Sequence, residues 1–155
     1  MLRLAGAAIL MAFSTPAYAA DWYYVSNASN YANISFIDKD SIREDDAGLT
    51  RASMFSLLAK PEDDDALAYR FEIEFNCRSK ESRLVAAEVY DSARNPRGET
   101  PMTGDWSPVE PATQGASVAD FVCSKGKTGA TAAGRQLPFD TGAAMLANLA
   151  KAGGK

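Results

Sequence analysis

The stretch AYRFEIEFNC, residues 68–77, decides the fold of this chain. Its odd-numbered positions, from Tyr69 to Cys77, are apolar, and most of its even-numbered positions are charged or polar. Strict alternation is typical of a β-strand, because successive side chains point to opposite faces of a sheet. We therefore expect a strand over 68–77 with one face toward a core and the other face in water.

The flanking segments extend this strand into an antiparallel sheet. After a polar connection, residues 83–90 are rich in valine and alanine and are predicted to form a hairpin with 68–77. Upstream, short apolar runs bounded by turn residues predict further strands. Prolines and Gly104 interrupt the region from 99 to 111, which leaves room for one short edge strand. The additional predicted strands cover 22–25, 34–37, 49–58 and 106–109.

The periodicity changes near the second cysteine. Val118, Phe121 and Val122 stand at the spacing of one helix face, and Ser117 is available as an N-cap. This pattern predicts a short helix over 117–124. Together with the strands, it indicates an α+β domain with an antiparallel sheet of about five to six strands and a short C-terminal helix.

Beyond residue 124 the composition becomes simple. Residues 125–135 are mainly glycine, alanine, threonine and lysine, which bury little apolar surface. We therefore expect the domain to span 20–124 and residues 125–155 to form a flexible, low-complexity tail. A short helix through Met145 and Leu149, capped by Asp140 or Thr141, could dock on a partner or on the domain itself, but a frayed tail is the favoured interpretation.

The first 19 residues have the three zones of a secretory signal peptide. Arg3 lies near the start, residues 4–13 are apolar, and small residues alternate up to Ala19. Cleavage is expected after Ala19, because a cut after Ala20 would place Tyr18 at a position that favours small residues. The apolar run has about ten residues, whereas a membrane anchor needs roughly 20. We expect a periplasmic or secreted protein without a lipid anchor, because no cysteine lies near the cleavage point.

Export determines how the two cysteines are interpreted. Cys77 and Cys123 are 46 positions apart, and an oxidising compartment favours a disulfide between them. The alternative is a redox-active pair, but the chain has no Cys-x-x-Cys spacing. A structural disulfide is therefore the prediction, and it would clamp the predicted helix to the strand 68–77.

Composition excludes several functional classes. The chain has 155 residues, 46% of them hydrophobic, which is typical of one globular domain. It contains no histidine, so catalytic triads and dyads that use imidazole are excluded. The formal net charge of −4, which becomes −5 without residues 1–19, argues against binding to nucleic-acid phosphates or anionic membrane surfaces.

Two acidic clusters raise the question of a metal site. Calcium favours several carboxylate oxygens, but an EF-hand loop beginning at Asp38 would need glycine where Arg43 stands. The second cluster, 62–65, is typical of a solvated turn between strands. We therefore predict no metal site and no cofactor. The acidic residues of the two clusters are Asp38, Asp40, Glu44, Asp45, Asp46, Glu62, Asp63, Asp64 and Asp65.

Other side chains carry groups that can take part in catalysis. Glu72 and Glu74 lie on one face of the strand 68–77, and paired carboxylates can hydrolyse glycosides. The alternating charges of a solvated exterior explain the same pattern more simply. Serine–lysine catalysis needs a buried lysine, and the pairs Ser79-Lys80 and Ser124-Lys125 stand at polar ends of elements. No catalytic residue is therefore predicted.

Three consecutive aromatic residues follow the predicted cleavage site. In a strand, Tyr23 must face away from Trp22 and Tyr24. This arrangement requires either a second covered face or an exposed contact patch. Packing in the core or at an edge is the favoured interpretation, and a partner surface is the alternative.

An ordered series of segments resembles a known family. The series consists of Trp22-Tyr23-Tyr24, the segment 36–42, a strand ending in Cys77, Val89-Tyr90-Asp91, Trp106 and Phe121-Val122-Cys123. Over about residues 21–124 it resembles the surface-adhesin protein E family of Gram-negative bacteria. The resemblance implies a small exported domain with a curled antiparallel sheet and a helix. For the namesake branch it also implies binding of host matrix or serum proteins, although this chain lacks a lipidation cysteine.

These observations favour a non-enzymatic, exported binding or envelope-associated protein. Its partner would be a protein ligand or an envelope component. One alternative is a small periplasmic hydrolase that uses carboxylates or a metal. Another is a structural subunit that completes a sheet edge in an assembly.

Overall fold

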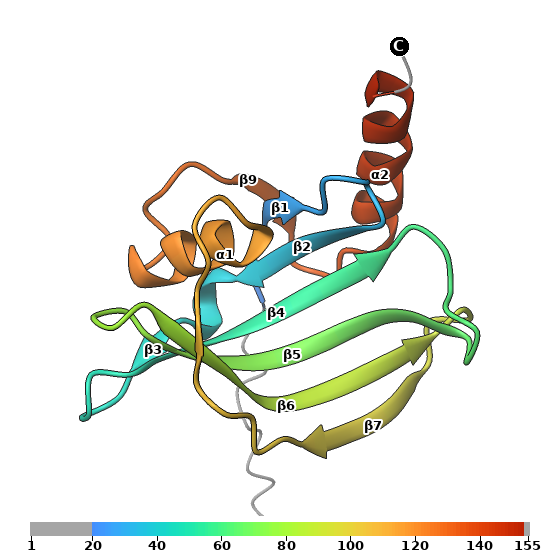
Figure 1. Ribbon diagram of the computed structural model, residues 1–155. Coiled ribbons are helices and arrows are strands. Elements are labelled where there is room, and N and C mark those ends of the chain that lie inside the picture. The colour runs from blue at the N-terminus through green and yellow to red at the C-terminus, as the bar shows by residue number, and fades with distance from the viewer. Residues whose placement is uncertain (1–19, 154–155) are drawn as a thin grey trace, which may run out of the picture.

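The computed structural model describes residues 20–153. The predicted signal peptide and its cleavage site after Ala19 lie outside the described residues. The described chain folds into one sheet of nine strands with two α-helices (Figure 1). In chain order the elements are β1 (Trp22–Asn27), β2 (Asn33–Asp38), the 3-10 helix η1 (Lys39–Ser41), β3 (Arg43–Glu44), β4 (Thr50–Leu58), β5 (Ala66–Asn76), β6 (Glu81–Asp91), β7 (Pro96–Pro101), β8 (Ser107–Pro108), α1 (Gln114–Cys123), β9 (Thr131–Gly134) and α2 (Phe139–Gly153).

The sheet is antiparallel and unclosed, with the order β7-β6-β5-β4-β2-β1-β9. Two short strands lie off this path: β3 pairs with β4, and β8 pairs with β6. The hairpin of β5 and β6 confirms the central prediction. The predicted edge strand over 106–109 is β8, and the sheet has three strands more than predicted, because β3 and β9 have only two and four residues and β7 begins and ends with proline.

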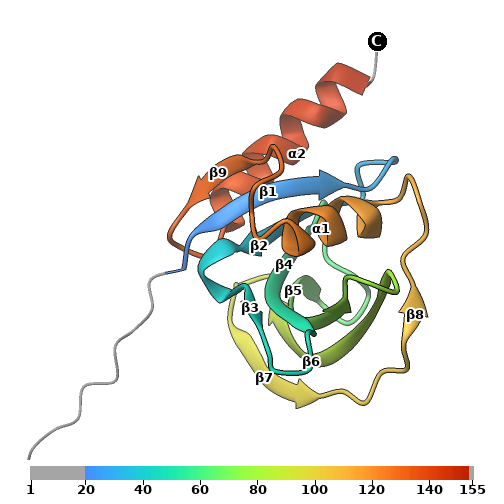
Figure 2. The same ribbon diagram turned by 90° about the vertical axis from the view of Figure 1, so that its left-hand side faces the viewer.

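The sheet curls, and each helix covers a different face of it (Figure 2). Helix α1 lies on the concave face and packs over the buried side chains of one core. Helix α2 lies against the opposite face and packs over a second core. The first core contains Ile37, Ala52, Ile73, Phe75, Val118, Phe121 and Val122, and the second contains Trp22, Ile34, Phe36, Phe55, Leu57, Ala68, Tyr90, Phe139 and Leu146.

The expectation of one wet face on β5 is wrong. Near its start the strand buries Ala68 in the core under α2, and near its end it buries Phe75 in the core under α1. The side chains still alternate between faces, but the covered face changes along the strand. Tyr69 and Phe71, stacked with ring centroids 5.6 Å apart, consequently remain only half-buried on the concave face.

Strand β1 is covered on both faces, which accounts for its three aromatic residues. Trp22 packs edge-on against Phe55, with ring centroids 6.0 Å apart, in the core under α2. Tyr23 points to the other face and packs 5.7 Å from the ring of Phe121 in α1. These aromatics join β1 to the cores under both helices, as the interpretation of core packing predicts.

Helix α1 begins one turn earlier than predicted. Its N-cap is Thr113, whose Oγ1 accepts a hydrogen bond from the backbone N–H of Ala116 at 3.1 Å. The predicted cap, Ser117, lies inside the helix. The spacing of the hydrophobic residues predicts the buried face correctly. It gives no sign of the first turn, because that turn is polar and includes Gln114.

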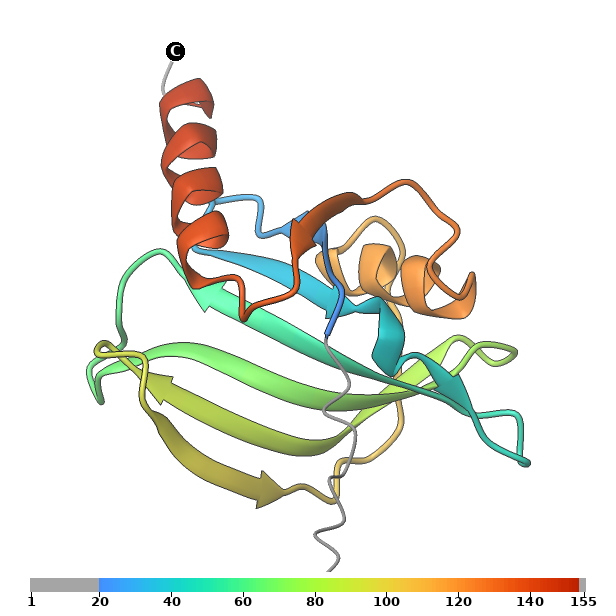
Figure 3. The same ribbon diagram turned by 180° about the vertical axis from the view of Figure 1, so that it is seen from behind.

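The segment 125–155, predicted as a flexible tail with a possible short helix, contains that helix as α2, and most of the segment packs against the domain. Strand β9 pairs with β1, and the first turns of α2 bury Phe139 and Leu146 (Figure 3). Gly142 permits this close approach, because a Cβ atom there would lie 2.7 Å from Cδ2 of Leu57. Backbone pairing and one apolar helix face order a segment whose composition is otherwise simple.

The disulfide between Cys77 and Cys123 joins the residue after β5 to the last residue of α1. Their Cα atoms are 5.6 Å apart. The predicted bridge thus fixes the C-terminal end of the helix to the sheet. Among the described residues, no helix is long and apolar enough to cross a membrane.

Candidate functional site

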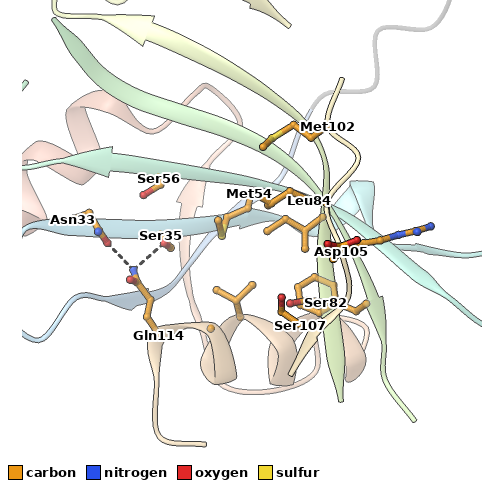
Figure 4. A pocket seen from close by; sticks show the side chains of 16 residues that line it. Asn33, Ser35, Met54, Ser56, Ser82, Leu84, Met102, Asp105, Ser107 and Gln114 are labelled. Atoms are coloured by element: carbon orange, nitrogen blue, oxygen red, sulfur yellow. Dashed lines mark hydrogen bonds between the residues drawn. The ribbon is translucent and has the colours of Figure 1, made fainter. Parts of the chain in front are cut away.

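The concave face holds a pocket of about 510 Å³ (Figure 4). Its floor is formed by β2, β4, β5 and β6, one wall is formed by α1, and the opposite wall is formed by the chain between β7 and β8. Its size lies within the range of small-ligand sites, and it is open to solvent. The curl of the sheet and the incomplete cover by α1 together create it.

One end of the pocket is polar and uncharged. The side chain of Gln114, the first residue of α1, donates hydrogen bonds from Nε2 to Oδ1 of Asn33 and Oγ of Ser35, both at 2.9 Å. Ser56 lies directly opposite Ser35 on the neighbouring strand. These four side chains gather at one end of the cavity (Figure 4), which we call the amide end.

The middle of the pocket is apolar. Met54, Leu84 and Met102 line one side of it, and Phe75 and Val118 come from the core under α1. Met102 is an exposed large hydrophobic residue, with 38% of its surface accessible to solvent. Methionine side chains adapt their shape to a ligand more readily than branched ones do. This section of the pocket can therefore accept an apolar group.

The segment between β7 and β8 is held close to the edge of β6. Gly104 donates from its backbone N–H to the carbonyl oxygen of Leu84 at 3.3 Å, and Met102 donates to the carbonyl oxygen of Val85 at 2.8 Å. A Cβ atom at position 104 would lie 3.0 Å from the Leu84 oxygen, so any other residue would push the two backbones apart by a few tenths of an ångström. The register of β6 against β5 shifts at the same place, where a bulge redirects the strand.

The opposite end of the pocket carries Ser82, Ser107 and Asp105 (Figure 4). Asp105 is exposed at the rim. Arg83 also lines this pocket. Its guanidinium group stacks over the ring of Trp106, 4.6 Å from the ring centroid, and pairs with Glu74. The carboxylate at this rim is therefore not matched by Arg83.

Glu74 forms a buried ion-pair cluster on the convex face. It is only 1% exposed, and its two oxygens accept hydrogen bonds from Nε of Arg51 at 2.8 Å and Nε of Arg83 at 2.7 Å. The three residues lie opposite one another on β4, β5 and β6. Burial by itself would raise the pKa of Glu74, but the hydrogen bonds and positive charges of the two arginines outweigh it and lower the pKa.

This cluster predicts a loss of stability in acid. Because the pKa of Glu74 is lowered in the folded state, its stabilising effect is complete above the ordinary pKa of 4.5 and is lost as the pH falls below that value. We expect Glu74→Gln to lower the free energy of unfolding by about 1–2 kcal/mol at pH 7, since both arginines are partly exposed. The difference between variant and wild type should shrink on acidification, as measured by urea unfolding from pH 7 to 3.

Glu99→Gln is the matched control for this prediction. Glu99 is 53% exposed, and its carboxylate lies 3.7 Å from Arg70 in an ion pair on the same face. Its replacement should change stability by less than about 0.5 kcal/mol. Equal effects of the two substitutions, or a gap for Glu74→Gln that does not change with pH, would contradict the assigned role of the buried carboxylate.

Glu72 and Glu74 do not form a catalytic pair. Glu72 lies 3.8 Å from Arg43 in an ion pair, whereas Glu74 is enclosed by its two arginines. The expected solvated exterior is thus wrong for Glu74. Both glutamates also point away from the pocket, because they alternate along β5 with Ile73 and Phe75, which line it.

The acidic loops form local contacts. Oδ1 of Asp38 caps η1, and Oδ1 of Asp45 accepts from two backbone N–H groups in the following turn. Glu44 pairs with Lys125 at 2.7 Å. In the second loop, Arg97 lies 3.7 Å from both Asp64 and Asp65. Within residues 20–153 no three potential metal-ligating side chains come together.

The serine–lysine pairs are also engaged elsewhere. Ser79 donates its hydroxyl to Glu81 at 2.6 Å in the turn before β6. Ser124 donates to the backbone oxygen of Phe121 at 3.0 Å and so closes the end of α1. Lys125 points to Glu44, so the structure does not aim its amine at the neighbouring hydroxyl.

The pocket was not predicted from the sequence. A signal is visible in retrospect, because Ser35 and Ser56 each stand between two large apolar residues in buried strands. The alternation predicts that both serines share one face, and their small polar side chains mark the part of that face that α1 leaves open. Gln114 and Asp105 give no such signal, because folding alone brings them to the same cavity.

The comparisons with known proteins identify the family. A family model described as surface-adhesin protein E matches residues 22–124. The chain belongs to the surface-adhesin protein E family. The match covers the sheet from β1 to β8 and helix α1, and therefore includes the whole pocket, while β9 and α2 follow it. No curated protein and no solved structure matches the chain.

Proposed function

We propose that this member of the surface-adhesin protein E family is an exported, non-enzymatic binding protein whose partner is a host protein or a component of the bacterial envelope. The observation that carries this proposal is the family match over 22–124. A pocket with apolar walls, an uncharged polar end and an acidic rim supports it, because such a lining is suited to holding a ligand.

The position of the charged groups argues against the alternative of a small hydrolase. The buried carboxylate, Glu74, lies on the face opposite the pocket and has a lowered pKa, so it is a poor general acid. The pocket brings serine hydroxyls and amides together, but the chain has no histidine that could act as their general base. These residues can form hydrogen bonds with a ligand, which favours binding over catalysis.

Export by a signal peptide cleaved after Ala19, and release without a lipid anchor, complete the proposal. The sequence pattern of residues 1–19 supports export, and the disulfide supports an oxidising compartment. The acidic net charge of −4 favours protein partners over nucleic acid.

Cell fractionation tests the export part of the proposal. In the native producing cell we expect the intact mass to be that of a chain beginning at Ala20. The protein should be found in the periplasm, at the surface or in the medium. Protease treatment of intact cells separates surface display from the periplasm. Recovery of unprocessed protein in the cytoplasm would contradict export.

A binding assay tests the ligand part. If protease removes the protein from intact cells, purified protein should bind saturably to immobilised extracellular-matrix or serum proteins. If the protein is periplasmic, site-specific crosslinking in living cells should join it to a defined envelope protein. Absence of a saturable partner in both assays would contradict the proposal.

A further inference from the structure

The pocket on the concave face is unequal at its two ends, and this inequality indicates the chemistry of its ligand. We propose that it binds an extended peptide segment of the partner, in which an apolar residue is followed by a basic residue. The inference rests on the proposed function, because it takes the partner to be a protein.

The amide end is complementary to a peptide group. Nε2 of Gln114 and Oδ1 of Asn33 are used in the hydrogen bond between them. Among the described residues, Oε1 of Gln114 and Nδ2 of Asn33 have no protein partner, so an acceptor and a donor remain for a ligand. In an extended segment the N–H and the carbonyl oxygen of one residue point to the same side, so one ligand residue can bond to both amides together. The hydroxyl of Ser56 can serve as either donor or acceptor beside them.

The middle of the pocket is complementary to an apolar side chain. Met54, Leu84 and Met102 face the cavity from one side (Figure 4). Val118 of α1 also lines it. Burial of a leucine-sized side chain away from water makes this section the main source of affinity. A peptide whose apolar residue is reduced to glycine should therefore bind at least about tenfold more weakly.

The rim supplies the preference for charge. Arg83 lines the same pocket but pairs with Glu74, and Asp105 forms no ion pair with any described residue. Its position at the end of the pocket opposite Gln114 suits a basic side chain that follows the apolar one. Because the rim is exposed, replacement of that basic residue by an acidic one should weaken binding only about fivefold.

The test uses three capped dipeptides and the purified, oxidised protein. N-acetyl-leucyl-lysine amide, N-acetyl-leucyl-glutamate amide and N-acetyl-glycyl-lysine amide are titrated into isotope-labelled protein and followed by NMR. We expect the leucyl-lysine peptide to bind most tightly and to shift the signals of Asn33, Ser56, Leu84 and Asp105. Saturable shifts confined to other surfaces, or equal binding of the lysine and glutamate peptides, would overturn the inference.

Two variants assign the effect to the proposed contacts. Asp105→Asn should abolish the preference for lysine over glutamate while the leucine-dependent binding remains. Gln114→Ala should weaken all three peptides. Asp46→Asn removes the same charge from an exposed distal turn and should change none of these affinities. A preference for lysine that survives Asp105→Asn would overturn the role of the rim.

The outcome can be separated from that of the proposed function. If the whole protein binds its partner and the variants Asp105→Asn and Gln114→Ala bind equally well, the protein is a binding protein but this pocket is not its site. If the wild-type protein is neither exported nor bound to any partner, the proposed function fails whatever the dipeptides do.

Discussion

Replacement of both Cys77 and Cys123 by alanine is expected to lower the free energy of unfolding by about 4 kcal/mol. The bridge closes a loop of 46 residues in sequence separation, and the loss of chain entropy that it imposes on the unfolded state gives this magnitude. The loss is a large part of the total stability of a domain of this size. Urea unfolding of the variant and of the oxidised wild type measures it.

The same variant tests how the bridge supports the pocket. The disulfide holds the last turn of α1, while Gln114 at the first turn holds the amide end. Val118, Phe121 and Val122 still pack on the sheet, so the helix should remain in place and the folded variant should keep its far-ultraviolet circular dichroism. Reduced wild-type protein is the control and should match the variant. Equal unfolding midpoints for oxidised and reduced wild type would contradict the prediction.

The strand pattern of the centre of the sheet was predictable from sequence. Alternation over 68–77 and the apolar run over 83–90 correctly predict the hairpin of β5 and β6, because both segments pair locally through a short turn. The spacing of Val118 and Phe121 likewise locates the buried face of α1. These signals are local, and each depends on the periodicity of one element.

The predictions that are wrong concern residues whose neighbours in the fold are distant in sequence. Glu74 has the pattern of a solvated residue, but Arg51 and Arg83 on adjacent strands enclose it. The tail has the composition of a flexible linker, but its strand β9 pairs with the edge of β1. In addition, α2 packs closely against Leu57 and Phe36 at Gly142, which has no side chain. Composition cannot reveal a partner that tertiary structure supplies.

The pocket depends on both kinds of information. Ser35 and Ser56 are placed on one face by strand alternation, which sequence contains. The place where α1 stops covering that face is set by the cap at Thr113 and by the segment around Gly104, which crosses the edge of β6. Residues of a site assembled in this way carry no motif, so the family match identifies the domain but the structure is needed to locate the cavity.

Phe55→Ala is expected to destabilise the protein by about 3–5 kcal/mol, because the substitution leaves a cavity in the core under α2. The ring of Phe55 is fully buried and contacts three aromatic rings from separate elements: Trp22 of β1, Tyr90 of β6 and Phe139 of α2, with centroids 4.9–6.0 Å away. Hydrogen exchange should therefore show reduced protection in α2 and at the pairing of β1 with β9, in addition to a lower unfolding midpoint.

Phe71→Ala makes the same chemical change on the other face of the sheet and serves as the matched control. Phe71 lies on the neighbouring strand, is half-buried, and stacks on Tyr69 at the open part of the concave face. Its truncation should cost about 1 kcal/mol, since solvent fills the space and little cavity forms. Protection in α2 should not change. A similar loss of stability for both variants would mean that the two faces of β4 and β5 do not differ as described, and that α2 does not depend on the Phe55 cluster for its position.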